Sequence, residues 1–238
     1  MNTFLMLTAS FAEKFKAAFE VVTIGDYAKA FLATMGITLL STLMAYLVGI
    51  PLGVFLYGTS EPKMFPNRPV NKILGVFVNV FRSIPFIIML VMIQPVAKLV
   101  VGSKIGNAAF IFYLTVAAIP FIARMIETSL HEVDKGIIEA AQSMGAGNFK
   151  IICKVLIPEA KPSLLFGAAI VFATILGYTP MAYLIAGDGL GVLAIQYGLY
   201  RFNPTVMYIS SILLIILVQI MQEAFGFLAR KTDRRISK

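Results

Sequence analysis

The chain has 238 residues, of which 59% are hydrophobic and only 13% charged, and its net charge is +8. A water-soluble domain usually has about 45–50% apolar and about 25% charged residues, and a chain of this size has too little interior to hide so much apolar surface. The composition excludes an ordinary soluble domain and predicts a membrane protein. Its basic residues are scattered rather than gathered on one polar face, which argues against nucleic-acid binding.

Residues 1–30 precede the first long apolar run and are predicted to form an N-terminal interfacial segment outside the membrane core. Residues 1–22 are too short and too charged to span a bilayer. Their apolar side chains recur at helical spacing, at Phe11, Phe15, Phe19 and Val22. This pattern predicts an amphipathic helix at the membrane surface. No basic residue precedes the apolar stretch 4–7, which argues against a cleaved signal peptide.

Five apolar runs are long enough to cross a hydrocarbon core of about 30 Å. We predict spans at residues 31–57, 74–96, 105–122, 164–185 and 206–228. The sequence thus predicts an all-α membrane protein, with a transmembrane domain over residues 31–228 and a basic cytoplasmic tail over residues 229–238.

The orientation follows from the distribution of Lys and Arg between the loops. Basic residues gather between spans one and two, between spans three and four, and after span five. Because loops rich in Lys and Arg stay in the cytoplasm, we expect the N-terminus outside and the C-terminus inside.

Arg82 is the one charge that lies clearly within a predicted span, in Phe81-Arg82-Ser83-Ile84-Pro85. One interpretation makes residues 74–83 an interfacial helix whose Arg82 reaches toward water. The other gives Arg82 a role in a transport pathway. No Asp or Glu lies near the middle of a span, which weakens an ion-coupled or proton-coupled mechanism. With one cysteine, Cys153, and one histidine, His131, the sequence predicts no metal site.

The cytoplasmic loop 124–161 carries its own helical pattern. Its apolar residues recur at spacings of three and four, at Leu130, Val133, Ile137, Ala140, Ala141 and Met144. We expect this helix to stop at Gly145-Ala146-Gly147, where glycine permits a left-handed turn. A second short helix, capped by Asn148, should then run until Pro158.

Within this loop, Glu139-Ala140-Ala141 is followed after three residues by Gly145 and after nine more by Val155-Leu156-Ile157-Pro158. This spacing resembles the EAA loop of ABC importer permeases and departs from the family pattern only at Val155 and Ile157. The resemblance implies a type I importer transmembrane domain whose coupling helix docks on a separate ATPase. The coupling residues that it implies are Glu139, Ala140, Ala141, Gly145 and Pro158.

No Gly-Lys pair occurs in the sequence, so the chain has no P-loop of its own. We therefore expect a non-catalytic subunit without a cofactor, with ATP and Mg²⁺ bound by the partner ATPase. The alternative left open is an ion-coupled secondary transporter of a small solute. An intramembrane enzyme is disfavoured because the spans lack a nucleophile, base or metal constellation.

Four further segments are similar to the methionine-uptake permeases: residues 82–88, 120–124, 132–136 and 189–202. That resemblance implies a homodimer in the bacterial inner membrane, bound to two ATPase subunits and to an external substrate-binding lipoprotein. It implies uptake of D- or L-methionine, or a related small amino acid, by alternating access. The segment 181–188 departs from the family pattern at Tyr183 and Asp188, which leaves the substrate open.

The fourth span should bend at Gly177-Tyr178-Thr179-Pro180, because Pro180 cannot donate a backbone hydrogen bond. Irregular backbone at membrane depth is tolerated where it lines a cavity or is packed in protein. We therefore expect a substrate pathway bordered by Tyr178, Thr179, Met181, Tyr183 and Arg82. Ordinary helix packing is the alternative for these residues.

Overall fold

The structure is a computed structural model that describes residues 13, 15–16, 18–60 and 64–232. Within that part of the chain, long apolar helices are α2 (Ile24–Thr59), α6 (Gly106–His131), α9 (Ile157–Tyr178) and α11 (Pro204–Thr232). A bent pair, α3 (Arg68–Ser83) and α4 (Phe86–Met92), makes a fifth candidate span. These helices confirm the predicted all-α membrane fold.

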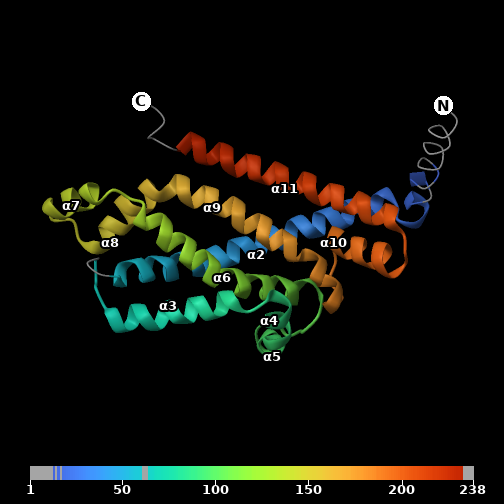
Figure 1. Cartoon of the computed structure of the whole chain (residues 1–238), viewed down its shortest axis with the longest axis horizontal. Coiled ribbons are helices and arrows are strands. Elements are labelled where there is room, and N and C mark those ends of the chain that lie inside the picture. The colour runs from blue at the N-terminus through green and yellow to red at the C-terminus, as the bar shows by residue number, and fades with distance from the viewer. Residues whose placement is uncertain (1–12, 14, 17, 61–63, 233–238) are drawn as a thin grey trace.

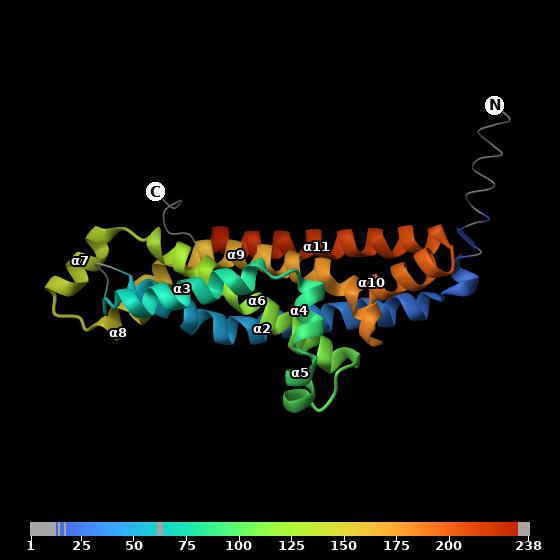
Figure 2. The same cartoon turned by 60° about the horizontal axis from the view of Figure 1, so that its bottom comes forward.

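The long helices lie side by side along one axis (Figures 1 and 2). One end of this bundle carries two short helices, α7 (Lys135–Ser143) and α8 (Asn148–Ile151), together with the last turns of α11. The other end carries the first turns of α2 and the short helix α10 (Leu190–Leu193), which continues into a π-helical segment, Ala194–Tyr200. Helices α7 and α8 and the C-terminal end of α11 are therefore at the same end of the bundle, as the two long helices between them, α9 and α11, require.

The predicted second span, residues 74–96, is not one straight helix. Helices α3 and α4 meet at 105°, and α5 (Gln94–Val101) follows α4. Pro85 lies at this break, where its ring cannot continue the hydrogen-bond ladder of α3. Helix α3 runs along the bundle, whereas α4 and α5 project away from it (Figure 2). Helix α3 thus runs parallel to the long apolar helices, and the interpretation of residues 74–83 as an interfacial helix stays a prediction.

Helix α2 contacts α6 closely because two glycines of α2 face it. A Cβ atom on Gly49 would lie 2.5 Å from the side chain of Ile122, and one on Gly53 would lie 2.6 Å from the carbonyl oxygen of Ala123. The four-residue spacing places both glycines on one face, as in other membrane helix pairs with small residues at the contact. This contact joins α2 to α6 over the C-terminal halves of both helices.

The boundaries of several predicted segments differ from the structure. The helix that contains the first predicted span begins at Ile24, seven residues before that span, because Thr23 and Asp26 form a capping box that starts the helix there. The third span continues to His131. Most of the predicted amphipathic helix lies outside the described residues, but Ala18 and Val22 are buried in one cluster with Leu190 and Val206. The tail beyond Thr232 also lies outside the described part.

Candidate functional site

The loop between α6 and α9 forms a small helical projection, here called the knob, which comprises α7, the turn at residues 144–147, and α8. The predicted continuous helix from Leu130 to Met144 is interrupted: α6 ends at His131, and α7 begins after Asp134, whose side chain accepts a hydrogen bond from the backbone N–H of Gly136. Val133, between the two helices, is buried in the main core. Its burial draws the chain inward and separates the knob from α6.

The turn that closes α7 lies where the sequence predicts it. Gly145 has φ of +75°, in the left-handed region that favours glycine. The backbone N–H of Ala146 donates to the carbonyl of Ala141 at 3.1 Å and closes the helix end. A Cβ on Gly145 would meet open space, so the backbone conformation and not crowding selects glycine here.

The second helix of the knob does not end at Pro158, contrary to the sequence prediction. Helix α8 continues through a π-helical turn, Ile152–Leu156, directly into α9, which contains Pro158 in its first turn. The backbone N–H of Ile157 donates to the carbonyl of Ile152 in this wider turn. The π turn lets the helix pass the proline ring without a break. The knob is consequently rigidly continuous with the fourth span.

The predicted coupling residues divide between two faces of the knob. Glu139, Ala140 and Gly145 are exposed, whereas Ala141 is 5% exposed and packs into the core of its own chain. Two large apolar side chains extend from the knob into solvent: Met144 is 81% exposed and Phe149 is 79% exposed. An exposed apolar patch at the tip of a projection is typical of a docking surface.

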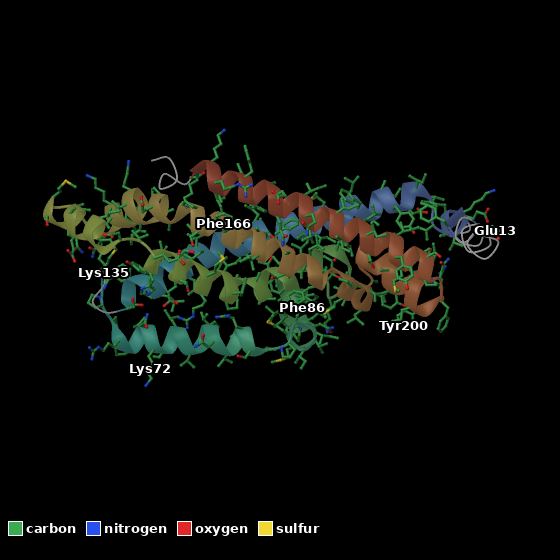
Figure 3. The ribbon with its side chains drawn as sticks, turned by 45° about the horizontal axis from the view of Figure 1, so that its top comes forward. Glu13, Lys72, Phe86, Lys135, Phe166 and Tyr200 are labelled. Carbon is green, nitrogen blue, oxygen red and sulfur yellow. The ribbon has the colours of Figure 1, made fainter. Side chains whose placement is uncertain are left out.

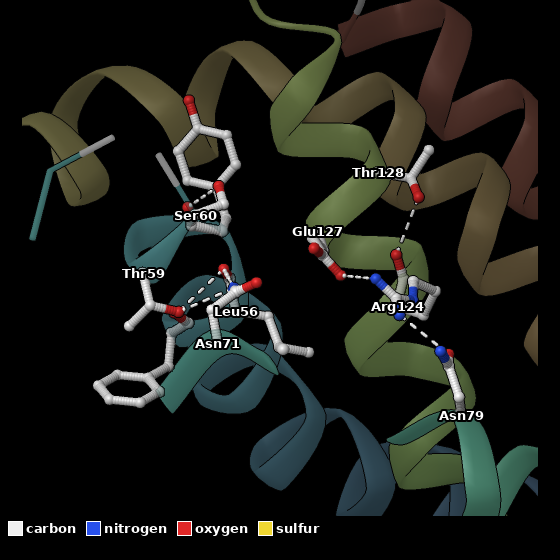
Figure 4. Close-up of polar contacts among 10 residues, drawn as sticks. Leu56, Thr59, Ser60, Asn71, Asn79, Arg124, Glu127 and Thr128 are labelled. Carbon is white, nitrogen blue, oxygen red and sulfur yellow. Dashed lines mark hydrogen bonds and ion pairs between the residues drawn. The ribbon is translucent and has the colours of Figure 1, made fainter. Parts of the chain in front are cut away.

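Arg124 joins α6 to α3 next to the knob end of the bundle. One guanidinium nitrogen lies 2.6 Å from a carboxylate oxygen of Glu127, and the other donates to the side-chain oxygen of Asn79 at 2.9 Å (Figure 4). Glu127 is buried, and Arg124 is its partner in an ion pair. The hydrogen bond from Arg124 to Asn79 therefore holds α3 against α6.

A cavity of about 200 Å³ lies at the break between α3 and α4. Arg82 and Ile84 line it from the end of α3, Phe86 lines it from α4, and Tyr178 lines it from the end of α9. Figure 3 shows Phe86 about midway along the bundle, away from the end that carries Lys72 and Lys135. The rings of Phe86 and Tyr178 stack with centroids 4.6 Å apart.

The cavity has one charged side chain and a mainly aromatic and aliphatic lining. The guanidinium carbon of Arg82 lies 5.8 Å from the ring centre of Phe121, within cation–π range. Thr174 contributes a hydroxyl from α9. A cationic group beside apolar walls suits a small solute that carries both an anionic group and an apolar side chain.

Of the five predicted pathway residues, the structure brings Arg82 and Tyr178 together in this cavity. The other three do not line it. Thr179 is buried and donates its hydroxyl to the carbonyl of Leu176 at 2.7 Å, Met181 packs against the core, and Tyr183 stacks on Tyr200 with centroids 5.0 Å apart. The predicted irregular backbone is present, because α9 changes at Thr179 to a 3₁₀ helix, Thr179–Ile185.

Sequence reasoning assigned no role to Phe86, Phe121 or Thr174, although all three line the cavity. Phe86 directly follows the Pro85 break, and this position was the available signal. Phe121 and Thr174 carried no such signal. Phe121 resembles any other apolar residue of a span, and the hydroxyl of Thr174 donates to the carbonyl of Ile170 in its own helix. No group of three metal-ligating side chains occurs in the described ranges.

At the end of the bundle opposite the knob, two long-range contacts hold the chain. Asn107, at the start of α6, donates to a carboxylate oxygen of Asp188 at 2.9 Å and accepts from the backbone N–H of Asp188 at 2.7 Å. The hydroxyl of Thr34 accepts from the backbone N–H of Leu190 at 2.9 Å. The turn before α10 is thereby fixed to both α2 and α6.

These features match a known protein family. The family described as "Binding-protein-dependent transport system inner membrane component" matches residues 49–234, which include the knob and the cavity. The chain belongs to this permease family. It is thus a multi-pass inner-membrane component of a binding-protein-dependent transport system.

Two relatives of this permease cover most of its length. It is 47% identical over 192 residues to the probable D-methionine transport system permease protein MetI of Vibrio cholerae serotype O1, covering 81% of this chain and 85% of the relative. It is 38% identical over 180 residues to the methionine import system permease protein MetP of Bacillus subtilis, covering 76% and 81%.

The fold of the permease is also that of a solved structure, described as inward-facing conformations of the MetNI methionine ABC transporter. The TM-score is 0.86 and the identity 40%, over 89% of this chain and 98% of the other. This match confirms the predicted type I importer transmembrane fold.

Proposed function

We propose that this permease is the transmembrane subunit of an ATP-driven importer of methionine or a closely related small amino acid. The names of its relatives supply the substrate class. The cavity supports it, because Arg82 offers a charge for an α-carboxylate while Phe86 and Tyr178 offer apolar surface for a thioether side chain.

The single observation that carries the ATP-driven mechanism is the exposed apolar tip of the knob. Met144 and Phe149 are largely exposed, and the knob that carries them lies at one end of the bundle, where a cytoplasmic partner can reach it (Figure 1). Hydrophobic side chains so exposed are stabilised by burial in an interface. We assign this surface to an ATPase subunit, which binds ATP and Mg²⁺, while this chain catalyses no step.

The proposed assembly contains two copies of this chain, two ATPase subunits and an external substrate-binding lipoprotein. The N-terminus lies outside and the C-terminus in the cytoplasm. The placement of the knob and the end of α11 at one end of the bundle supports this orientation. ATP binding would draw the ATPases together and move both knobs. The cavity would then open to the opposite side of the membrane.

The ion-coupled carrier is the weaker alternative. Such carriers need titratable groups near mid-membrane, whereas Glu127, the buried carboxylate of the described spans, is paired with Arg124 toward the knob end of α6. The function can be tested by expressing this chain, its ATPase and its binding protein in a methionine-requiring strain without its own uptake system. Growth on limiting methionine is expected only when the ATPase keeps its P-loop lysine. Equal growth with a lysine-to-alanine ATPase would contradict the proposal.

A further inference from the structure

The knob is hydrogen-bonded to the loop that begins α3, far from it in the sequence. The side-chain amide nitrogen of Asn148, in the first turn of α8, donates to the backbone carbonyl of Met64 at 2.7 Å. Met64 and Phe65 are partly buried against the same core cluster as Ala146, which lies in the turn of the knob. The loop, residues 64–67, therefore contacts the knob through a hydrogen bond and packs against the same core as the turn of the knob.

The same loop is held tightly to the end of α2. The backbone N–H of Phe65 donates to the carbonyl of Gly58, and that of Asn67 donates to the carbonyl of Thr59, both at 3.1 Å. The ring of Phe65 occupies the space where a side chain on Gly58 would be. The loop has little freedom to move independently of the helix ends around it.

The loop also starts α3. The side chain of Asn67 accepts a hydrogen bond from the backbone N–H of Val70 and caps the helix. Asn71, one turn further, donates to the carbonyl of Leu56 at 2.8 Å (Figure 4). At its other end α3 carries Arg82, which lines the cavity beside the Pro85 break.

These contacts form a continuous path from the knob through the loop and α3 to the cavity. We propose that Asn148 is a positioning residue that transmits displacement of the knob to α3, and through it to the cavity wall. This inference rests on the proposed function, in which an ATPase moves the knob. It adds a second route of coupling beside the direct continuity of α8 with α9.

The hydrogen bond is the part of this path that a single substitution can remove. Asn148→Asp has nearly the same shape, but it has no N–H donor and sets a carboxylate against the carbonyl of Met64. Asn148→Gln keeps the donor on a longer side chain and serves as the matched variant. Because Asn148 is exposed, both variants are expected to fold and to assemble with the ATPase at wild-type stoichiometry.

The first readout is the number of substrate molecules taken up per ATP hydrolysed by the reconstituted complex. For Asn148→Asp we expect a fall of about fivefold, the lower end of typical allosteric coupling factors, with ATP hydrolysis retained. Asn148→Gln should recover most of the loss. Reduced ATPase association in Asn148→Asp would overturn the inference, because Asn148 would then be a docking residue.

The second readout follows the two ends of the path separately in a Cys153→Ser background. Spin labels at Gln142→Cys report on the knob, and labels at Lys72→Cys report on α3, as distances between the two copies in the dimer. On ATP trapping, both distances should change in the parent protein, whereas only the knob distance should change in Asn148→Asp. If the distance between the labels at Lys72→Cys changed as much in Asn148→Asp as in the parent, with normal uptake per ATP, the inference would be overturned and the proposed function would stand. Absence of ATP-dependent uptake in the parent would contradict the proposed function itself.

Discussion

The ring of Phe86 stacks on the ring of Tyr178 at an interplanar angle of 12°. Phe86 is the first residue of α4 and Tyr178 the last of α9, so this contact joins the two places where the spans depart from regular α-helix. A change in either helix break would alter the cavity between them.

Replacing Tyr178 by Leu is expected to lower substrate uptake while ATPase association stays unchanged. Aromatic pairs contribute about 0.5–1.5 kcal/mol beyond their buried area, which corresponds to a loss of up to about tenfold. Initial rates of methionine uptake measure the effect. The control is Tyr208→Leu on α11, where the ring is 61% exposed. Equal rates for the two variants would contradict a role of the stack in the pathway.

Replacing Met144 by Glu is expected to weaken binding of the ATPase by about tenfold or more, because a charge would enter an apolar contact. Affinity for the ATPase can be measured in detergent or nanodiscs. Cys153→Ser, an exposed change on the same cytoplasmic segment, should leave the affinity unaltered. Unchanged affinity of Met144→Glu would place the docking surface elsewhere.

Replacing Arg124 by Ala is expected to destabilise the protein by about 1–3 kcal/mol, because the buried carboxylate of Glu127 and the amide of Asn79 both lose their partner. Arg230 provides a comparison: its nitrogen lies 3.7 Å from Glu223, and both side chains are largely exposed. Arg230→Ala should cost no more than about 1 kcal/mol. Unfolding of the purified variants in detergent gives both values, and a larger loss for Arg230→Ala would refute the assignment.

Replacing Gly53 by Ala is expected to force α2 and α6 apart, since the new methyl group would meet the backbone of Ala123. Overpacking of this kind costs about 1–3 kcal/mol. Gly36→Ala on the same helix meets open space and should be neutral or slightly stabilising, because alanine favours helix over glycine. Thermal unfolding compares the two variants. Equal stabilities would show that α2 and α6 can move apart at this contact without a cost in stability.

The parts of the fold that sequence predicted well depend on local chemistry. The turn at Gly145 follows from the backbone limits of glycine, and the long helices follow from apolar length. Pro158 was misinterpreted as a helix end because proline is also compatible with the first turn of a helix, which is where it lies in α9. The pairing of Phe86 with Tyr178 and of Asn148 with Met64 joins distant segments, so periodicity within either segment contains no signal for it.

The central claim is that ATP hydrolysis in a partner, transmitted through the knob, drives uptake through this chain. The most direct measurement is uptake of labelled methionine into proteoliposomes that contain the chain with its ATPase, with the binding protein outside and ATP inside. We predict uptake that requires hydrolysable ATP, persists when ionophores collapse all ion gradients, and stops in vesicles that lack the ATPase. Uptake driven by an ion gradient without ATP would contradict the account.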